Sequence, residues 1–146
     1  MKKSQRLAPV IKVAKNREQD AAKALSESRR IVEKNEAKLN ELLAYQQEYT
    51  KRYEEIGRNG MEINKINEYR QFLARLNEAI SGQRELIKFK QSEVDKKNQT
   101  WNQTRVKHKS IDKMVTRHRT DERHDEDRRE QGEADDRSQH VKPVKD

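Results

Sequence analysis

The chain is short, highly charged and poor in apolar residues. Of its 146 residues, 41% are charged and 30% are hydrophobic, with only four glycines and two prolines, so it lacks the apolar material for a conventional globular core. The net charge is +8 and there is no cysteine, which excludes disulfides and thiolate metal sites. Neither a signal-peptide core nor the ~18 apolar residues of a membrane helix occurs. We therefore expect an extended, soluble helical protein that stays in the cytoplasm.

A heptad pattern predicts a first coiled-coil helix over residues 1–56. Steps of alternately four and three residues from Leu7 to Ile56 visit fifteen positions, and eleven of them are apolar or aromatic. The register is unbroken over seven repeats. Such a stripe requires a partner helix.

Residues 57–61 are predicted to form the turn. Gly57 is suited to end a helix in the left-handed conformation, and Asn59 with Gly60 favours a tight turn. Gly82 stands alone inside a strong heptad pattern, so we interpret it as tolerated within a helix.

A second stripe predicts a coiled-coil helix over residues 62–118. From Ile66 to Val115 the same steps visit fifteen positions, ten of them apolar or aromatic, and the pattern then fades. Two matched stripes joined by a short turn predict an all-α fold, a long antiparallel two-helix coiled-coil hairpin. A turn centred near residue 59 predicts the facing pairs Tyr49 with Tyr69, Leu42 with Leu76, Leu25 with Val94, and Leu7 with Ile111.

Residues 119–146 are predicted to be a charged tail, at first helical and then disordered from Gly132 onward. Residues 116–146 carry eight Lys plus Arg against ten Asp plus Glu and almost no apolar side chain, so they have no face to bury. A weak metal-ligand pattern occurs at the start of the tail (His118, Glu122, His124 and Asp125). Because nothing around it would orient ligands, we assign no metal.

The motifs of enzymes are missing. The sequence has no phosphate-binding loop, no nucleotide fingerprint, and no Ser or Cys in a nucleophile setting. We therefore expect no enzymatic activity and no cofactor.

Basic residues gather where the two chain ends of the hairpin would meet. Residues 1–115 carry 26 Lys plus Arg against 16 Asp plus Glu, and the cluster from Arg105 to Lys113 is suited to nucleic acid or acidic lipid. The alternative is the solvated flank of a coiled coil. We expect a strongly positive tip that is drawn to an acidic cleft or pore; its candidate binding residues are Lys12, Lys15, Lys107, Lys109 and Lys113.

Two motifs carry a resemblance to a known family. The stretch "LLAYQQEYTKRY" (42–53), a Gly-containing turn, then "INEYRQFLARLNEAI" (66–80) and a single Trp101 together resemble the FliJ family of flagellar type III export proteins. The resemblance extends over about residues 5–110 and does not include the tail after residue 116.

The resemblance implies a non-catalytic, stalk-like coiled coil whose paired ends enter the hexameric flagellar export ATPase and promote its activity. It also implies contact with the cytoplasmic domain of the large export-gate membrane protein, and binding of flagellar export chaperones. The expected location is the cytoplasm, peripherally at the inner membrane at the flagellar base. No nucleic-acid partner is implied.

The family's gate-binding patch maps near the predicted turn, onto Leu42, Tyr45, Tyr49, Phe72, Leu76 and Ala79. The family often has His where this chain has Gln83. Tyr45, Phe72 and Ala79 fall outside the heptad stripes, so we expect them to be exposed, with Tyr45 beside Phe72. For Tyr49 and Tyr53, simple core packing is the alternative to an interface role.

Two other functions stay open at this point. A basic coiled coil that binds nucleic acid would use residues 107–113 and would show steep salt dependence. A purely structural coiled coil would dimerise through its remaining apolar surface.

Overall fold

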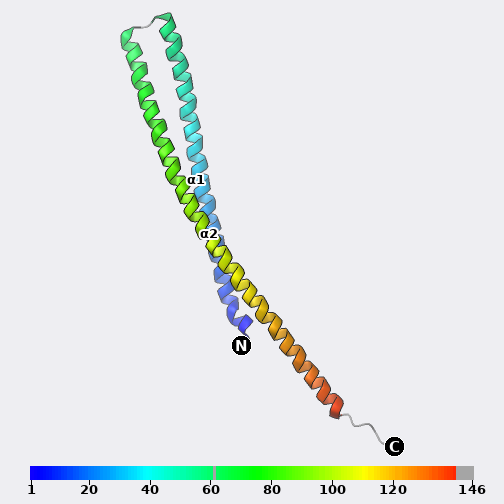
Figure 1. Cartoon of the computed structure of the whole chain (residues 1–146). Helices are drawn as coiled ribbons and strands as arrows, with labels where there is room; N and C mark the ends of the chain where they lie inside the picture. Colours follow the sequence, from blue (N-terminus) through cyan, green and yellow to red (C-terminus); the bar gives the residue numbers. More distant parts are fainter. Residues whose placement is uncertain (61, 141–146) are drawn as a thin grey trace, which may run out of the picture. The chain divides into compact units, whose positions relative to one another are not determined.

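The fold consists of two long helices. The computed structural model describes residues 1–60 and 62–140, and within them α1 spans Lys3–Asn59 and α2 spans Ile63–His140, with no strand (Figure 1). The helices run antiparallel and pack against each other. The predicted all-α hairpin is therefore confirmed.

Each helix contributes to two compact units. The first, here the terminal unit, combines residues 1–20 with the part of α2 that begins at residue 102. The second, here the turn unit, comprises residues 21–101 and contains the turn.

The predicted heptad stripes are the packed faces of both helices. All fifteen positions of the first stripe are buried or half-buried, and so are all positions of the second stripe except Lys97. In the turn unit, Leu25, Val32 and Val94 form a buried cluster against which Trp101 packs. Burying one such aliphatic side chain contributes about 1.5–3 kcal/mol, so a few layers of this kind hold the helices together.

One layer of the turn unit is polar. Asn35 is buried on its stripe and donates to the Ile31 carbonyl at 2.8 Å. Gln83, on the facing stripe, donates to the backbone oxygen of Asn35 at 2.9 Å and to its side-chain oxygen at 3.0 Å. Because Gln83 bonds across the seam to both oxygens of Asn35, the layer favours one alignment of the two helices.

The helix ends differ from the predicted ones. α1 continues through Gly57 to Asn59, and the left-handed residue is Gly60, with φ at 76°. The packed stripe continues almost to this end of α1, since Ile56 is still half-buried. α2 begins at Ile63, one residue after the predicted start.

The predicted pairing of the helices holds in the turn unit. Tyr49 lies against Tyr69 as predicted, and Leu25 shares a cluster with Val94.

The predicted pairing of Leu7 with Ile111 is wrong, because Ser4 bonds to Glu122 in the terminal unit and this places the partners about two helical turns further along α2. Glu18 shows the same shift, because it contacts His108; the departure from the predicted pairing is thus found in the terminal unit, while Tyr49 and Leu25 keep their predicted partners.

α2 continues far beyond the predicted boundary at residue 118. It remains helical through Gly132 to His140, so the disorder expected from Gly132 does not hold for residues 132–140. Pairs of opposite charge one turn apart, such as Arg137 with Glu133 at 3.8 Å, support a helix without a buried face. Residues 141–146 of the predicted tail lie outside the described residues.

Candidate functional site

The six predicted gate-binding residues divide between core and surface of the turn unit. Leu76 is buried, with 8% of its surface exposed, while Leu42 and Tyr49 are half-buried. Tyr45 is 53% exposed and Phe72 37% exposed, and Ala79 is exposed as well. These six residues are here called the turn patch. The expected exposure of its three members outside the stripes is met.

Tyr49 is the centre of the aromatic part of the turn patch. Its ring lies 4.4 Å from that of Phe72 and 6.3 Å from that of Tyr69, both tilted. The Arg52 guanidinium stands 5.5 Å from the same ring and bonds to Glu48 at 2.8 Å. The ring in contact with Phe72 is thus that of Tyr49, one turn of α1 after the predicted neighbour Tyr45.

Polar contacts between the helices hold the turn patch in place. Gln46 donates to Asn77 at 2.6 Å, and Arg70 donates to the Tyr53 hydroxyl at 2.9 Å. Tyr53 is therefore a packed seam residue with a satisfied hydroxyl. An exposed aromatic surface on such a fixed support loses little conformational entropy when a partner binds.

The five predicted lysines of the basic tip are all exposed in the terminal unit; they are Lys12, Lys15, Lys107, Lys109 and Lys113. No acidic residue occurs in residues 1–17, and Asp112 is the single one in residues 96–120. Between the helices, Glu18 contacts the Nδ1 atom of His108 on the seam. The lysines of the basic tip are thus exposed to solvent, whereas the Glu18 carboxylate contacts His108 between the helices.

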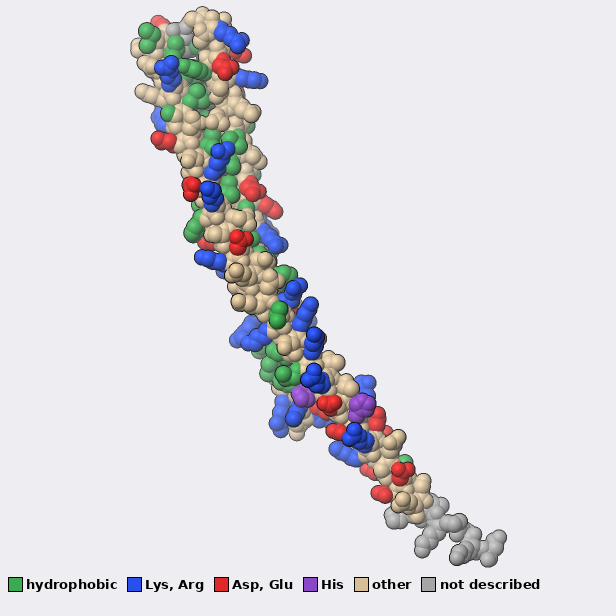
Figure 2. Space-filling view, viewed as in Figure 1, with side chains coloured by type: hydrophobic (Ala, Val, Ile, Leu, Met, Phe, Trp, Pro, Cys, Tyr) green, Lys and Arg blue, Asp and Glu red, His purple; other side chains and the backbone are tan. Residues whose placement is uncertain are grey.

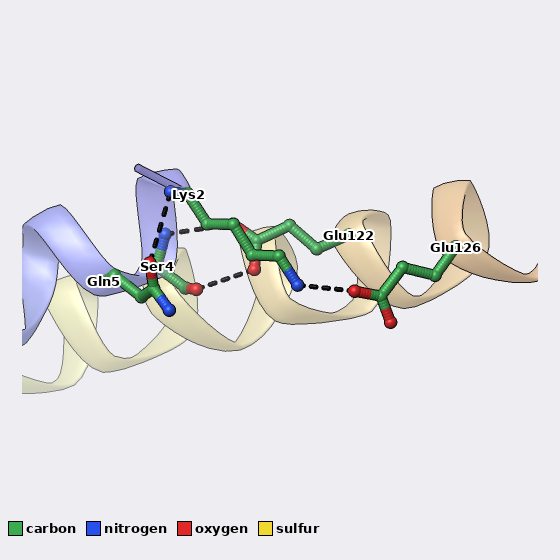
Figure 3. A network of polar contacts seen from close by, with 5 residues as sticks. All are labelled: Lys2, Ser4, Gln5, Glu122 and Glu126. Atoms are coloured by element: carbon green, nitrogen blue, oxygen red, sulfur yellow. Dashed lines mark hydrogen bonds and ion pairs between the residues drawn. The ribbon is translucent and has the colours of Figure 1, made fainter. Parts of the chain in front are cut away.

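A polar cluster joins the start of α1 to the charged part of α2, and sequence reasoning missed it. Glu122 accepts hydrogen bonds from the Ser4 backbone N–H at 3.1 Å and from the Ser4 hydroxyl at 2.6 Å. The Lys2 ammonium bonds to Glu126 at 2.5 Å, and the Lys2 backbone N–H is 3.4 Å from Gln5 (Figure 3). We call these four residues, Lys2, Ser4, Glu122 and Glu126, the terminal clamp.

The terminal clamp supplies what α1 lacks. The first turn of α1 contains no acidic residue, and helix N-termini leave N–H groups without partners and favour negative charge. Glu122 provides both the acceptor and the charge from α2. It also holds the residues before Pro9, a position where the helix loses one backbone hydrogen bond.

The same contacts shift three pKa values. The hydrogen bonds from the Ser4 hydroxyl and then from its backbone N–H hold the pKa of Glu122 below its ordinary value of 4.5. The hydrogen bond and charge of Lys2 likewise lower the pKa of Glu126, and Glu126 raises the pKa of Lys2. The charged forms of all three groups are therefore favoured in the folded chain.

The signal for the terminal clamp was present in the heptad register. Continuing the second stripe from Val115 reaches His118 and Glu122, and continuing the first stripe backwards from Leu7 reaches Ser4. Apolar periodicity does not reveal this contact, because Ser4 and Glu122 are polar residues at stripe positions. The metal-ligand pattern of the sequence includes Glu122, whose carboxylate is instead bonded by Ser4.

Both helices lie within the part of the chain that matches a known protein family. The family described as "Flagellar FliJ protein" matches residues 2–141. The chain belongs to the FliJ family. The match extends beyond the 5–110 resemblance at both ends, so the charged segment after residue 116 is part of the FliJ pattern.

One solved structure has a fold similar to that of this FliJ protein. A solved structure of a YscO homolog, CT670 from Chlamydia trachomatis, has a TM-score of 0.58 and 19% identity, covering 91% of each chain. At this identity the likeness concerns the fold alone. A search of curated proteins found no match.

Membership of the FliJ family makes the chain a component of the flagellar or type III export class. In the part of the chain that the structure describes, neither helix has a segment apolar enough to cross a membrane.

Proposed function

We propose that this FliJ protein is a non-catalytic, stalk-like subunit of the flagellar type III export apparatus. It binds and promotes the hexameric export ATPase through the basic tip, and it contacts the cytoplasmic domain of the export gate through the turn patch. It works in the cytoplasm, held at the inner membrane by these partners. The observation that carries the proposal is that the exposed lysines of the basic tip, with few acidic neighbours in the sequence, belong to one unit and the exposed rings of Tyr45 and Phe72 to the other.

The basic tip is suited to an acidic pore. Its cations are exposed and nearly free of competing carboxylates within residues 1–17 and 96–120, so an incoming acidic surface meets little repulsion. The action requires packing and charge, and no chemical step.

The turn patch is suited to a flat apolar site on a folded partner. Tyr45 and Phe72 offer exposed ring surface in the turn unit, and Phe72 is fixed by Tyr49. Rigid aromatic residues are common anchors of protein interfaces. Export chaperones are a further class of partner, for which the FliJ family membership is the support.

The deciding experiment measures ATP hydrolysis by the export ATPase with and without this chain. We expect stimulation by the unaltered chain, and apparent binding weaker by at least about fivefold when the five lysines of the basic tip become glutamine, since each exposed charge pair contributes about 0.2–1 kcal/mol. A matched control changes five lysines of the turn unit, namely Lys23, Lys34, Lys38, Lys51 and Lys65. No stimulation by the unaltered chain, or equal loss in both variants, would refute the role of the tip.

A further inference from the structure

A small apolar groove lies in the terminal unit. Of the five lysines of the basic tip, Lys107 is the one that lines it. The groove has a volume of about 90 Å³ and is lined by Val10, Val13 and Arg17 from α1 and by Lys107 and Ile111 from α2, among others. At ~30 Å³ per water in the liquid, this space holds about three waters or one aliphatic side chain. The groove is thus a socket for a single apolar residue.

The apolar surface continues along α2 beyond the groove. A shallower hollow shares Lys107 and Ile111 with it and adds Val106 and Ser110. Val10, Val13 and Val106 are 45%, 48% and 62% exposed, which is high for aliphatic side chains. On the face seen in Figure 2, hydrophobic and basic side chains lie together close to histidines. The socket therefore belongs to a longer apolar strip, here called the valine strip.

The rim of the valine strip is positively charged. Arg17 and Lys107 line the groove itself, and acidic residues are missing from residues 1–17. The single acidic residue of residues 96–120, Asp112, lines neither hollow. The strip thus pairs an apolar floor with cations, and its complement is an apolar stripe flanked by carboxylates.

We propose that the valine strip binds an acidic amphipathic helix of a partner protein. Apolar residues of that helix at i, i+3 or i+4 and i+7 lie along the strip, one of them in the groove, and its Asp or Glu side chains pair with Arg17 and Lys107. The resulting local arrangement is three helices, because two helices of the terminal unit leave this strip uncovered. The proposal goes beyond the ATPase role and does not rest on it.

Nucleic acid is a poorer match for the same surface. No Phe, Tyr or Trp occurs in residues 1–20 or 102–146, and single-stranded nucleic acids bind largely by stacking on such rings. A duplex would contact cations and leave the valines without a partner. The combination of valines and cations is explained by a helix that carries both kinds of complement.

The test uses the full chain and a fluorescently labelled synthetic helix of about 18 residues, with Leu at helical spacing and Glu on both flanks. Binding is measured by anisotropy at two salt concentrations, and methyl NMR of the valines and isoleucines locates the site. We expect micromolar binding, with shifts at Val10, Val13 and Ile111. Replacing both Val10 and Val13 by Ser weakens binding about tenfold.

Matched variants separate the strip from general effects. Changing Ile31 and Leu86, exposed apolar residues of the turn unit, to Ser leaves peptide binding unchanged, and circular dichroism verifies that all variants remain helical. Changing Arg17 and Lys107 to Gln weakens binding about fivefold and flattens its salt dependence.

Three outcomes overturn the proposal. The first is no binding of the peptide. The second is equal binding of a scrambled peptide or of one with Lys in place of Glu. The third is that the valine substitutions weaken binding of the chain to anionic vesicles or RNA as much as they weaken its binding to the peptide.

Discussion

Tyr45, Tyr49 and Tyr53 differ in role because Tyr45 lies one residue off the heptad stripe, whereas the other two lie on it. Tyr49 and Tyr53 lie on the stripe and are half-buried, and Tyr45 precedes a stripe position and is exposed. This division was predictable from the sequence, since the heptad register alone determines it. The stacking of Phe72 on Tyr49 was not predictable, because it depends on ring orientation and on a helix alignment that the turn sets.

The substitution Tyr45→Ala is expected to leave folding intact and to weaken gate binding. Its ring is more than half exposed, and surface changes of this kind shift stability by about 0.5 kcal/mol or less.

Phe72→Ala removes an aromatic pair worth about 0.5–1.5 kcal/mol, which lowers the melting temperature by about 2–4 °C. Thermal melts and titration with the gate's cytoplasmic domain measure both effects. A large loss of helicity in Tyr45→Ala would instead place this ring in the core.

The polar layer of Asn35 and Gln83 is expected to favour specificity over stability. Replacing both by Leu joins the apolar seam on either side and raises the melting temperature, as buried polar layers in coiled coils cost stability. The variant should also populate other alignments or oligomers. Light scattering and hydrogen exchange across the turn unit measure this, and a more stable variant with one state and unchanged exchange pattern would argue against an aligning role.

At the scale of the helices, the ends are decided by packing more than by local residue preference. Gly57 has the residue type of a helix terminator, yet α1 passes through it to Asn59, directly after the half-buried stripe residue Ile56. The existence, type and facing stripes of both helices were predictable from periodicity. The boundaries were not, since three nearby residues, Gly57, Asn59 and Gly60, are all able to end a helix.

Two glycine substitutions are expected to have opposite signs. A Cβ added at Gly57 meets nothing within 4 Å and the residue is helical, so Gly57→Ala stabilises by about 0.5–1 kcal/mol. Gly60 has a positive φ of 76°, so Gly60→Ala destabilises by about 1–2 kcal/mol. Urea unfolding measures both, and Gly60→Asn is the control, because Asn tolerates this conformation better. Equal effects at both glycines would contradict the assignment of Gly60 as the terminating residue.

The terminal clamp is expected to respond to pH at both extremes. Because the folded pKa of Glu122 is lowered from 4.5, its stabilisation is complete above pH 4.5 and is lost as pH falls through the lowered value. Because the folded pKa of Lys2 is raised from 10.5, its contribution is present below pH 10.5 and is lost as pH rises through the raised value. The Ser4 amide resonance and its exchange rate report the acid transition.

Glu122→Gln is expected to remove the acid transition at Ser4 while Glu126→Gln leaves most of it. The backbone and hydroxyl of Ser4 bond to Glu122, whereas Glu126 bonds to Lys2. A transition at Ser4 that persists in Glu122→Gln would show that another group controls it.

At the scale of the whole molecule, the aromatic residues are confined to one unit, and a stretch poor in acidic residues lies mostly in the other. All seven aromatic residues lie within residues 45–101, which belong to the turn unit, while Asp112 is the single acidic residue in residues 1–17 and 96–120. The uneven charge was apparent from the sequence. The contact of the charged segment with the start of α1 was not, because Ser4 and Glu122 are polar and lie far apart in the chain.

Two truncations are expected to divide the charged segment into a structural and a dispensable part. Deleting residues 127–146 leaves the terminal clamp intact and removes, within the described residues 127–139, only exposed side chains, so the melting temperature should stay within about 1 °C. Deleting residues 119–146 also removes both clamp carboxylates. The residues before Pro9 then lose their anchor, and their amides should exchange faster and be cut sooner by protease. Equal protection of residues 3–8 in both truncations would mean that the clamp contributes nothing to the start of α1.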